Sequence, residues 1–370
     1  MDKKILMAIV VAAVVVVAVV AAAFILRPEG RTGTVYYDTS ITVPNMKAAL
    51  STGLIDGFIS WEPFVSEASM DDTGEVLMWS SEMMPNHPCC VVVASTNFLE
   101  TEDGPDLTKR FLKAHMDATE WMLTANQDHD SAEYTLLVTL AQEFTLRNSS
   151  VVSAAMSHLE YKYEMDSSFT TALEEFTDMY IDLNITTNAA IADMGYDSVS
   201  DFADSYANET LLAEAGDIEP SSTILGTVRL GYLVGDIHQM AQFVANDPRV
   251  LDGDKSIFEK YGLEVAAAEG APFSSGGAEM DAFVAGDVDI GYLGAPPAIV
   301  KHLNGGAKTT IVAQANIEGS GLVVAKNSGI ESLDDLVNKT IAVPNVSSIQ
   351  FLLLKIALEE RGYDFVVKSS

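Results

Sequence analysis

A tryptophan and a carboxylate stand directly after a short apolar run in "IDGFISWEPF" (55–64). The run 55–59 predicts a buried strand that leads into Trp61, Glu62 and Pro63. An indole ring offers a flat apolar wall and one N–H donor, and a carboxylate offers two acceptors for an amine or a hydroxyl. We therefore expect Trp61 and Glu62 to contact a ligand, although a core tryptophan with a solvated glutamate would fit the same pattern.

A second polar group follows the apolar run of "GYLVGDIHQ" (231–239), where a helix is expected to start. Helix N-termini leave backbone N–H groups free and favour negative charge. His238 could donate to an anion there, and Gln239 lies beside it. Asp236 fits ligand contact and a simple helix cap equally well.

Three further expected helix starts are rich in small residues: "PFSSGGAEM", "LGAPPAI" and "PNVSSIQ". Glycines let a ligand approach the backbone, and free amides can hold an oxyanion. The first segment lacks the Gly-Lys-Ser/Thr of a nucleotide loop, and an ordinary cap explains each segment singly. The ligand-binding candidates in these segments are Ser274, Ser275, Gly276, Gly294, Ala295, Pro296, Ser347 and Ser348.

The two cysteines of the chain are adjacent, at Cys89 and Cys90, and His87 is close by. A vicinal pair rarely closes a disulfide ring. Side chains of neighbouring strand residues point to opposite faces, so we expect one sulfur in the core and no metal site. The sequence shows no convincing Ser-His-Asp order, HExxH motif or nucleotide loop, so we expect no catalytic residues and no cofactor.

Composition limits the possible functions. The chain has 370 residues, 48% of them hydrophobic, which suits one large domain or two lobes with a sizeable core. Its formal charge of −32 argues against nucleic acid as a partner.

The N-terminus contains 22 uncharged residues, 5–26, which is enough to span a membrane at about 1.5 Å per residue. Lys3 and Lys4 favour an inside N-terminus. We expect residues 1–31 to form a single uncleaved anchor in the cell membrane, with the bulk of the chain extracytoplasmic. A cleaved signal is the second interpretation.

The rest of the chain predicts an α/β protein. Residues 105–214 carry a run of helical patterns, 216–226 form a polar linker, and strands alternate with helices over 227–320 and beyond. A helix, a capping glycine, a short strand and a Pro-containing loop occur twice, at 46–64 and 280–299. Ligands bind beyond the carboxyl ends of strands in such sheets, so two facing lobes would form a binding site between them.

Four segments carry a family resemblance: "ALSTGLIDGFISWEPFV", "VRLGYLVGDIHQMAQFVA", "SSGGAEMDAFVAGDVDIGYLGAPPAIV" and "KTIAVPNVSSIQFLLLKIAL". Together they resemble ABC-transporter solute-binding proteins of the nitrate/sulfonate/taurine type. The resemblance implies a two-lobed, type II periplasmic-binding-protein fold, related to the thiamine-pyrimidine-precursor proteins, and covers nearly everything from Thr34 onward.

The order of the parts differs from that family, because residues 34–214 resemble its second part and 227–370 its first. The chain is either a circular permutant or a piece of a tandem protein. We expect the halves to fold together. Lobe one is then 98–320, and lobe two is 33–97 plus 321–370.

The resemblance implies an extracytoplasmic binding protein of an ABC importer, with permease and ATPase subunits as partners. The ligand would be a small molecule such as a sulfonate, taurine, nitrate or a related compound. Two alternatives stay open: an enzyme like the thiamine-pyrimidine synthases, which use a cysteine-rich segment and a histidine, or a ligand sensor without a permease. We expect binding without bond-making, so no enzyme.

Overall fold

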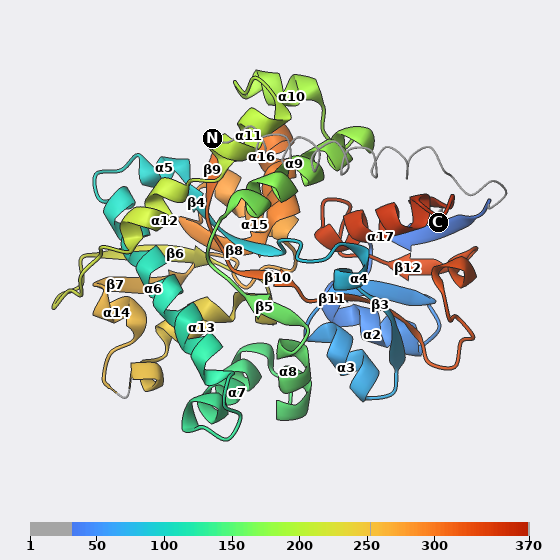
Figure 1. Cartoon of the computed structure of the whole chain (residues 1–370), viewed down its shortest axis with the longest axis horizontal. Coiled ribbons are helices and arrows are strands. Elements are labelled where there is room, and N and C mark those ends of the chain that lie inside the picture. The colour runs from blue at the N-terminus through green and yellow to red at the C-terminus, as the bar shows by residue number, and fades with distance from the viewer. Residues whose placement is uncertain (1–31, 252, 369–370) are drawn as a thin grey trace, which may run out of the picture.

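The computed structural model describes residues 32–251 and 253–368, which form two large β-sheets and one two-stranded sheet with helices around them (Figure 1). It confirms a mixed α/β fold whose sheets are consistent with a periplasmic-binding-protein-like architecture. The predicted membrane helix at 5–26 lies outside the described residues. Among the residues that are described, no helix is long and apolar enough to cross a membrane.

The first sheet has five strands in the order β7-β6-β8-β4-β9 and lies to the left in Figure 1. Strand β6 runs parallel to β7 and β8, whereas β4 runs antiparallel to both of its neighbours. The strand bounds are β4 Cys90–Ser95, β6 Gly226–Gly231, β7 Leu263–Ala267, β8 Ile290–Gly294 and β9 Thr309–Gln314.

The second sheet has six strands in the order β13-β1-β12-β2-β11-β3 and lies to the right. Strand β11 runs antiparallel to β2 and β3, and the other neighbours are parallel. The bounds are β1 Thr34–Asp38, β2 Gly57–Trp61, β3 Gly74–Trp79, β11 Ser320–Ala325, β12 Thr340–Ala342 and β13 Asp364–Val367.

Helices pack on both sheets, and the central strands are buried on both faces, as their near-continuous apolar runs require. Around the five-stranded sheet lie α6 Gly104–Ala125, α13 Met240–Asn246, α14 Ile257–Lys260, α15 Gly276–Ala285 and α16 Ala295–Gly305. Around the six-stranded sheet lie α2 Val43–Ser51, α3 Phe64–Met70, α4 Ser80–Met83 and α17 Ile349–Glu359.

The predicted helical run is present, and it packs on the five-stranded sheet and on its neighbouring helices. Within the range 105–214, where the sequence predicts a run of helices, one segment forms a strand instead. The helix α8 ends at Met156, and Leu159–Tyr161 then forms strand β5, which pairs with β10 (Asn316–Glu318). The other members are α7 Ala132–Thr145, α9 Ser167–Asp182, α10 Asn188–Asp193, α11 Val199–Tyr206 and α12 Glu209–Ala215, and α8 begins at Ser149.

The chain passes between the sheets before β4 and before β11. Strand β4 (Cys90–Ser95) lies in the five-stranded sheet, so the passage comes earlier than the predicted boundary at residue 97. The reason is that β4 pairs along its whole length with β8 and β9. At the second passage β11 begins at Ser320, next to the predicted boundary.

The first and last described strands are neighbours. Strand β1 lies between β12 and β13, with Thr34 opposite Asp364 and Tyr37 opposite Val367. Both described ends of the chain therefore lie in one sheet, whereas Ser370 lies outside the described residues. Whether the chain is a permutant or a piece of a tandem protein stays an interpretation.

Candidate functional site

A small cavity lies where the two sheets face each other, with a volume of about 30 Å³. That is room for roughly two water molecules, so the two sides are closed upon each other. Among the described residues, no lysine or arginine lines this cavity. Its lining residues are Trp61, Cys89, Cys90, Leu233, Asp236, His238, Ser275, Gly276, Gly294, Pro297, Pro344, Asn345, Ser348, Ile349 and Gln350.

Both sheets contribute strand ends and helix starts to the cavity. Gly294 ends β8 and caps α16, and Ser275 caps α15 by accepting from the N–H of Ala278. From the other side, Trp61 ends β2 and Ser348 caps α17. The cavity thus lies beyond the carboxyl ends of strands, where α/β folds bind ligands.

The most reactive part of the lining is a group of two thiols and an imidazole. The Sγ atoms of Cys89 and Cys90 lie 3.3 and 4.0 Å from Nδ1 of His238. Nε2 of His238 lies 2.9 Å from the carbonyl oxygen of Gly319, which can only accept, so Nε2 carries a proton. Nδ1 is therefore the atom that exchanges a proton with the thiols.

Both sulfurs point to the same place, contrary to our expectation from strand alternation. The N–H of Cys89 donates to the backbone oxygen of Asn316, and the N–H of Cys90 donates to Oδ1 of the same residue. Cys89 precedes the first residue of β4, so the regular pleat has not begun there. The alternation rule failed because it applies only inside a regular ladder.

The electrostatics of this group favour charge separation. The thiol of Cys90 and the imidazole of His238 hold the pKa of Cys89 well below its usual range, against the effect of burial. Burial lowers the pKa of His238, but the neighbouring Cys89 and Asp236 outweigh it and raise that pKa to about 9. A thiolate beside an imidazolium is the form of cysteine that acts as a nucleophile or a metal ligand.

Asp236 and Gln239 support this group. Oδ1 of Asp236 accepts from the N–H of His238, and Oδ2 accepts from the amide of Gln239 at 3.0 Å. Gln239 does not line the cavity, because its Oε1 accepts from the N–H of Leu233 and its Nε2 holds Asp236. Burial raises the pKa of Asp236 to about 6. Asp236 thus caps the turn and lines the cavity at once.

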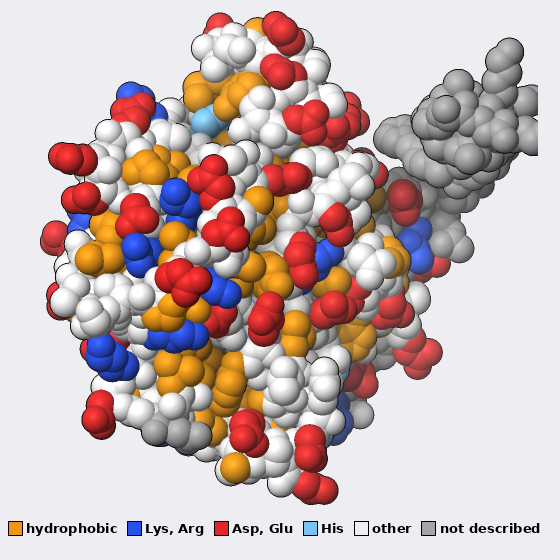
Figure 2. Space-filling view, turned by 60° about the vertical axis from the view of Figure 1, so that its left-hand side comes forward, with side chains coloured by type: hydrophobic (Ala, Val, Ile, Leu, Met, Phe, Trp, Pro, Cys, Tyr) orange, Lys and Arg blue, Asp and Glu red, His pale blue; other side chains and the backbone are white. Residues whose placement is uncertain are grey.

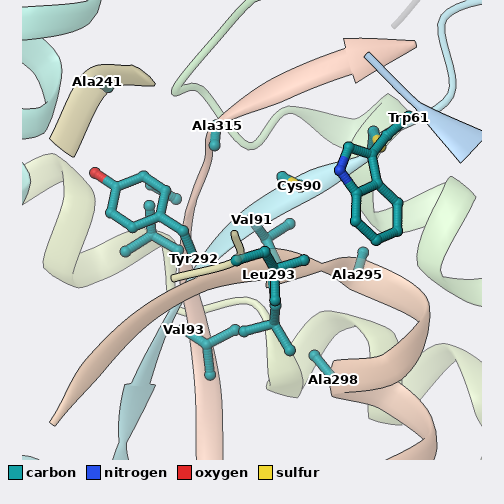
Figure 3. Close-up of a cluster of buried hydrophobic side chains, with 14 of the residues drawn as sticks. Trp61, Cys90, Val91, Val93, Ala241, Tyr292, Leu293, Ala295, Ala298 and Ala315 are labelled. Atoms are coloured by element: carbon teal, nitrogen blue, oxygen red, sulfur yellow. The ribbon is translucent and has the colours of Figure 1, made fainter. Parts of the chain in front are cut away.

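Trp61, the last residue of β2, forms one wall of the cavity. It is 4% exposed, and its ring packs edge-on against Phe64. Its Nε1 is buried without a hydrogen-bond partner among the described residues. Figure 3 shows this nitrogen on the side of the ring that faces Cys90. The cavity therefore offers an unused donor.

Glu62 does not have the role that we predicted. Its carboxylate is fully buried, accepts from the N–H and hydroxyl of Ser66, and lies 2.6 Å from Nδ1 of His158. It does not line the cavity. With these partners its oxygens are committed inside the protein, and Glu62 joins β2 to the segment after α8.

The structure brings seven of the thirteen candidate residues together at the cavity. The seven are Trp61, Asp236, His238, Ser275, Gly276, Gly294 and Ser348, and the six outside its lining are Glu62, Gln239, Ser274, Ala295, Pro296 and Ser347.

Sequence reasoning missed several lining residues, above all Cys89 and Cys90. Their signal was the pairing of two cysteines with a histidine far along the chain, which sequence spacing does not show. Asn345 and Gln350 flank the predicted Ser347 and Ser348, so a wider window around that helix start would have found them.

Comparison with known proteins places this site in a family. A model described as the NMT1-like family matches residues 38–136 and 237–368, which include Trp61, both cysteines and His238. The chain belongs to the NMT1-like family. This membership confirms the general family resemblance seen in the sequence, but it does not test the order of the parts or the type of ligand.

The curated relatives match over a shorter stretch. A "putative binding protein" of Brucella abortus is 33% identical over 135 residues, 36% of this chain and 38% of the relative. Proteins with the same description from Brucella suis and Brucella melitensis match to the same extent. The alignment thus spans well under half of the length of each of these relatives.

Proposed function

We propose that the chain is the extracytoplasmic solute-binding protein of an ABC importer, and that it closes two lobes on a small molecule without changing it. The supporting observation is the cavity, whose lining comes from both sheets. Family membership and the description of the relatives as binding proteins support the same role. Residues 5–26 would anchor the protein in the cell membrane beside its permease and ATPase partners.

The residues that line the cavity limit the kinds of ligand that it can bind. The family resemblance suggests a sulfonate, taurine, nitrate or a related compound. Since no described lysine or arginine lies at the cavity, an anion would depend on backbone amides, hydroxyls and protonated His238, which argues against a doubly charged ligand. Opening must precede entry, since the closed cavity is smaller than any of the organic candidates.

One observation favours a second candidate function. Cys89 lies 3.3 Å from Nδ1 of His238, and a thiol paired with an imidazole is a common nucleophile. An enzyme of the thiamine-pyrimidine-synthase type would use such a pair. Mass spectrometry separates the candidates, because a binding protein releases its ligand unchanged.

A thermal-shift screen tests the main proposal. The purified full-length protein, kept in mild detergent, is heated with nitrate, taurine, alkanesulfonates and pyrimidines. A true ligand at 100 times its Kd stabilises the protein by about 2.7 kcal/mol. The proposal is wrong if an identified ligand stabilises the protein equally after Trp61→Ala and Ser348→Ala, since contact from the second lobe would then be dispensable.

A further inference from the structure

Three potential metal ligands converge at the cavity. One side-chain atom each from Cys89, Cys90 and His238 lies within 4.8 Å of the others, and all three residues are buried. Zinc binds sulfur at about 2.3 Å and imidazole nitrogen at about 2.0–2.1 Å, so a tetrahedral ion separates N and S by about 3.6 Å. The observed separations of 3.3 and 4.0 Å lie on either side of that value.

The histidine already has the orientation that a ligand needs. Metal-binding histidines usually donate their second ring N–H to a carbonyl or a carboxylate, which fixes the tautomer and the ring. Nε2 of His238 makes this contact with the carbonyl of Gly319 at 2.9 Å. Nδ1 then turns its lone pair toward the two sulfurs.

The thiols are held in place in the same way. Asn316 accepts hydrogen bonds from the backbone N–H groups of both cysteines, and this arrangement turns both Sγ atoms toward His238. Both cysteines are free thiols. Two fixed thiolates and an imidazole select thiophilic ions such as zinc over magnesium or calcium.

The charge and the unused donor of the cavity also point to a cation with an open position. Oδ2 of Asp236 lies 3.6 Å from Sγ of Cys90, and among the described residues no lysine or arginine lines the cavity to compete with an ion. Three protein ligands leave a fourth position for water or a small molecule. Nε1 of Trp61, which has no acceptor in the part of the chain that the structure describes, would donate to the atom in that position.

We propose that Cys89, Cys90 and His238 bind one thiophilic divalent metal ion, such as Zn²⁺, on the wall of the cavity. Coordination replaces the thiol protons, which pass to solvent. The fourth position faces the space beneath Trp61. This inference goes beyond the proposed function, because it holds whether or not the chain serves an importer.

Cobalt provides a direct test, because thiolate-bound Co²⁺ has a charge-transfer absorption that other ligands do not give. The full-length protein in detergent is titrated with Co²⁺ and then with Zn²⁺. We expect one Co²⁺ per chain with this absorption, lost when Zn²⁺ displaces it. The chain has only two cysteines, so any thiolate absorption comes from this pair.

Substitutions of single residues test which side chains bind the ion. Cys89→Ser, Cys90→Ser and His238→Gln should each lower the affinity for Co²⁺ more than about tenfold, since even outer-shell partners are worth 10–100-fold. His129→Gln, which changes an exposed histidine, should bind as the parent does. Thiol counting with a maleimide needs no variant: saturating Zn²⁺ should protect both cysteines.

Absence of the thiolate absorption, or full maleimide reactivity in saturating Zn²⁺, would overturn the metal site. Neither result bears on the small-molecule screen, so failure here is distinguishable from failure of the proposed function.

Discussion

Trp61 offers two features that suit ligand recognition: a flat apolar wall, and a donor that has no acceptor among the residues the structure describes. The ring contributes packing area, and the N–H contributes one hydrogen bond. These contributions can be separated, because phenylalanine keeps much of the wall and removes the donor.

Trp61→Phe should weaken binding of the identified ligand by about 1 kcal/mol, roughly fivefold, with little change in the melting temperature. Trp61→Ala removes the wall as well and should cost about 2 kcal/mol or more, near thirtyfold. Calorimetry measures both affinities. Trp121→Phe, a tryptophan outside the cavity, is the control, and equal affinity in parent and Trp61→Phe would rule out the donor role.

Glu279 is a buried carboxyl in α15. Both of its oxygens lack hydrogen-bond partners among the described residues, and the carboxyl lies against Gly231 and Gly291. Burial, with a contribution from Asp236, raises the pKa of Glu279 well above its usual value. The folded protein therefore holds a proton that the unfolded chain releases above a pH of about 4.5.

Stability should consequently fall as pH rises from about 4.5 toward the raised pKa, because deprotonation favours the unfolded chain. Glu279→Met removes this carboxyl and should raise stability more at pH 8 than at pH 5. Denaturant unfolding at the two pH values measures the difference. Glu264→Gln, on the neighbouring β7, is the control, and an equal gain at both pH values would show that ionisation is not the cause.

At the level of elements, the residues on either side of α8 contact α3 and the ends of strands β2 and β3 in the six-stranded sheet. Arg147 pairs with Glu67 at 2.8 Å, and its guanidinium lies over the ring of Phe64 at 5.1 Å. His158 contacts Glu62 and stacks on Trp79 with ring centroids 3.9 Å apart. These contacts join the five-stranded side to the six-stranded side in the closed arrangement, so they should stabilise closure.

Arg147→Met keeps the aliphatic stem and removes the charge. If closure completes the site, the variant should bind ligand a fewfold more weakly, because a partly exposed ion pair contributes up to about 1 kcal/mol. Small-angle scattering should show a larger radius of gyration for the unliganded variant. Arg249→Met, which loses an ion pair with Glu143, is the matched control, and identical effects from both would contradict a closure role.

At the level of the whole molecule, the two sheets depend on segments from both ends of the chain. The six-stranded sheet takes β1–β3 from the first hundred residues and β11–β13 from residues 320–367, and the five-stranded sheet takes β4 from the first half. Acidic side chains are spread over the surface that encloses them (Figure 2). Neither half of the chain contains a complete sheet.

We therefore expect the full-length protein to unfold as one cooperative unit. Residues 32–215 and 227–370, expressed separately, should not fold, because each would leave strand edges and apolar faces uncovered. Circular dichroism with heating tests this prediction. Two independent, cooperative transitions from the separate halves would contradict it, and co-expression of both halves is the positive control.

The sequence by itself indicated most of the elements, the family in its coarser form and several residues that line the cavity. Continuous apolar runs and helix caps depend on neighbours along the chain, so strands such as β4 and β8 and the caps at Ser275 and Ser348 were predictable. Trp61 was found for the same reason, since the end of a strand is a local feature.

Tertiary structure alone decided which side chains meet. Glu62 was expected to face a ligand, yet His158, 96 positions away, takes its carboxylate. Cys89 and Cys90 were expected to face opposite ways, yet Asn316, 226 positions from Cys90, turns both toward His238. Hydrogen bonds between such distant residues form only when folding brings the residues together. A pattern of neighbouring residues in the sequence therefore cannot predict them.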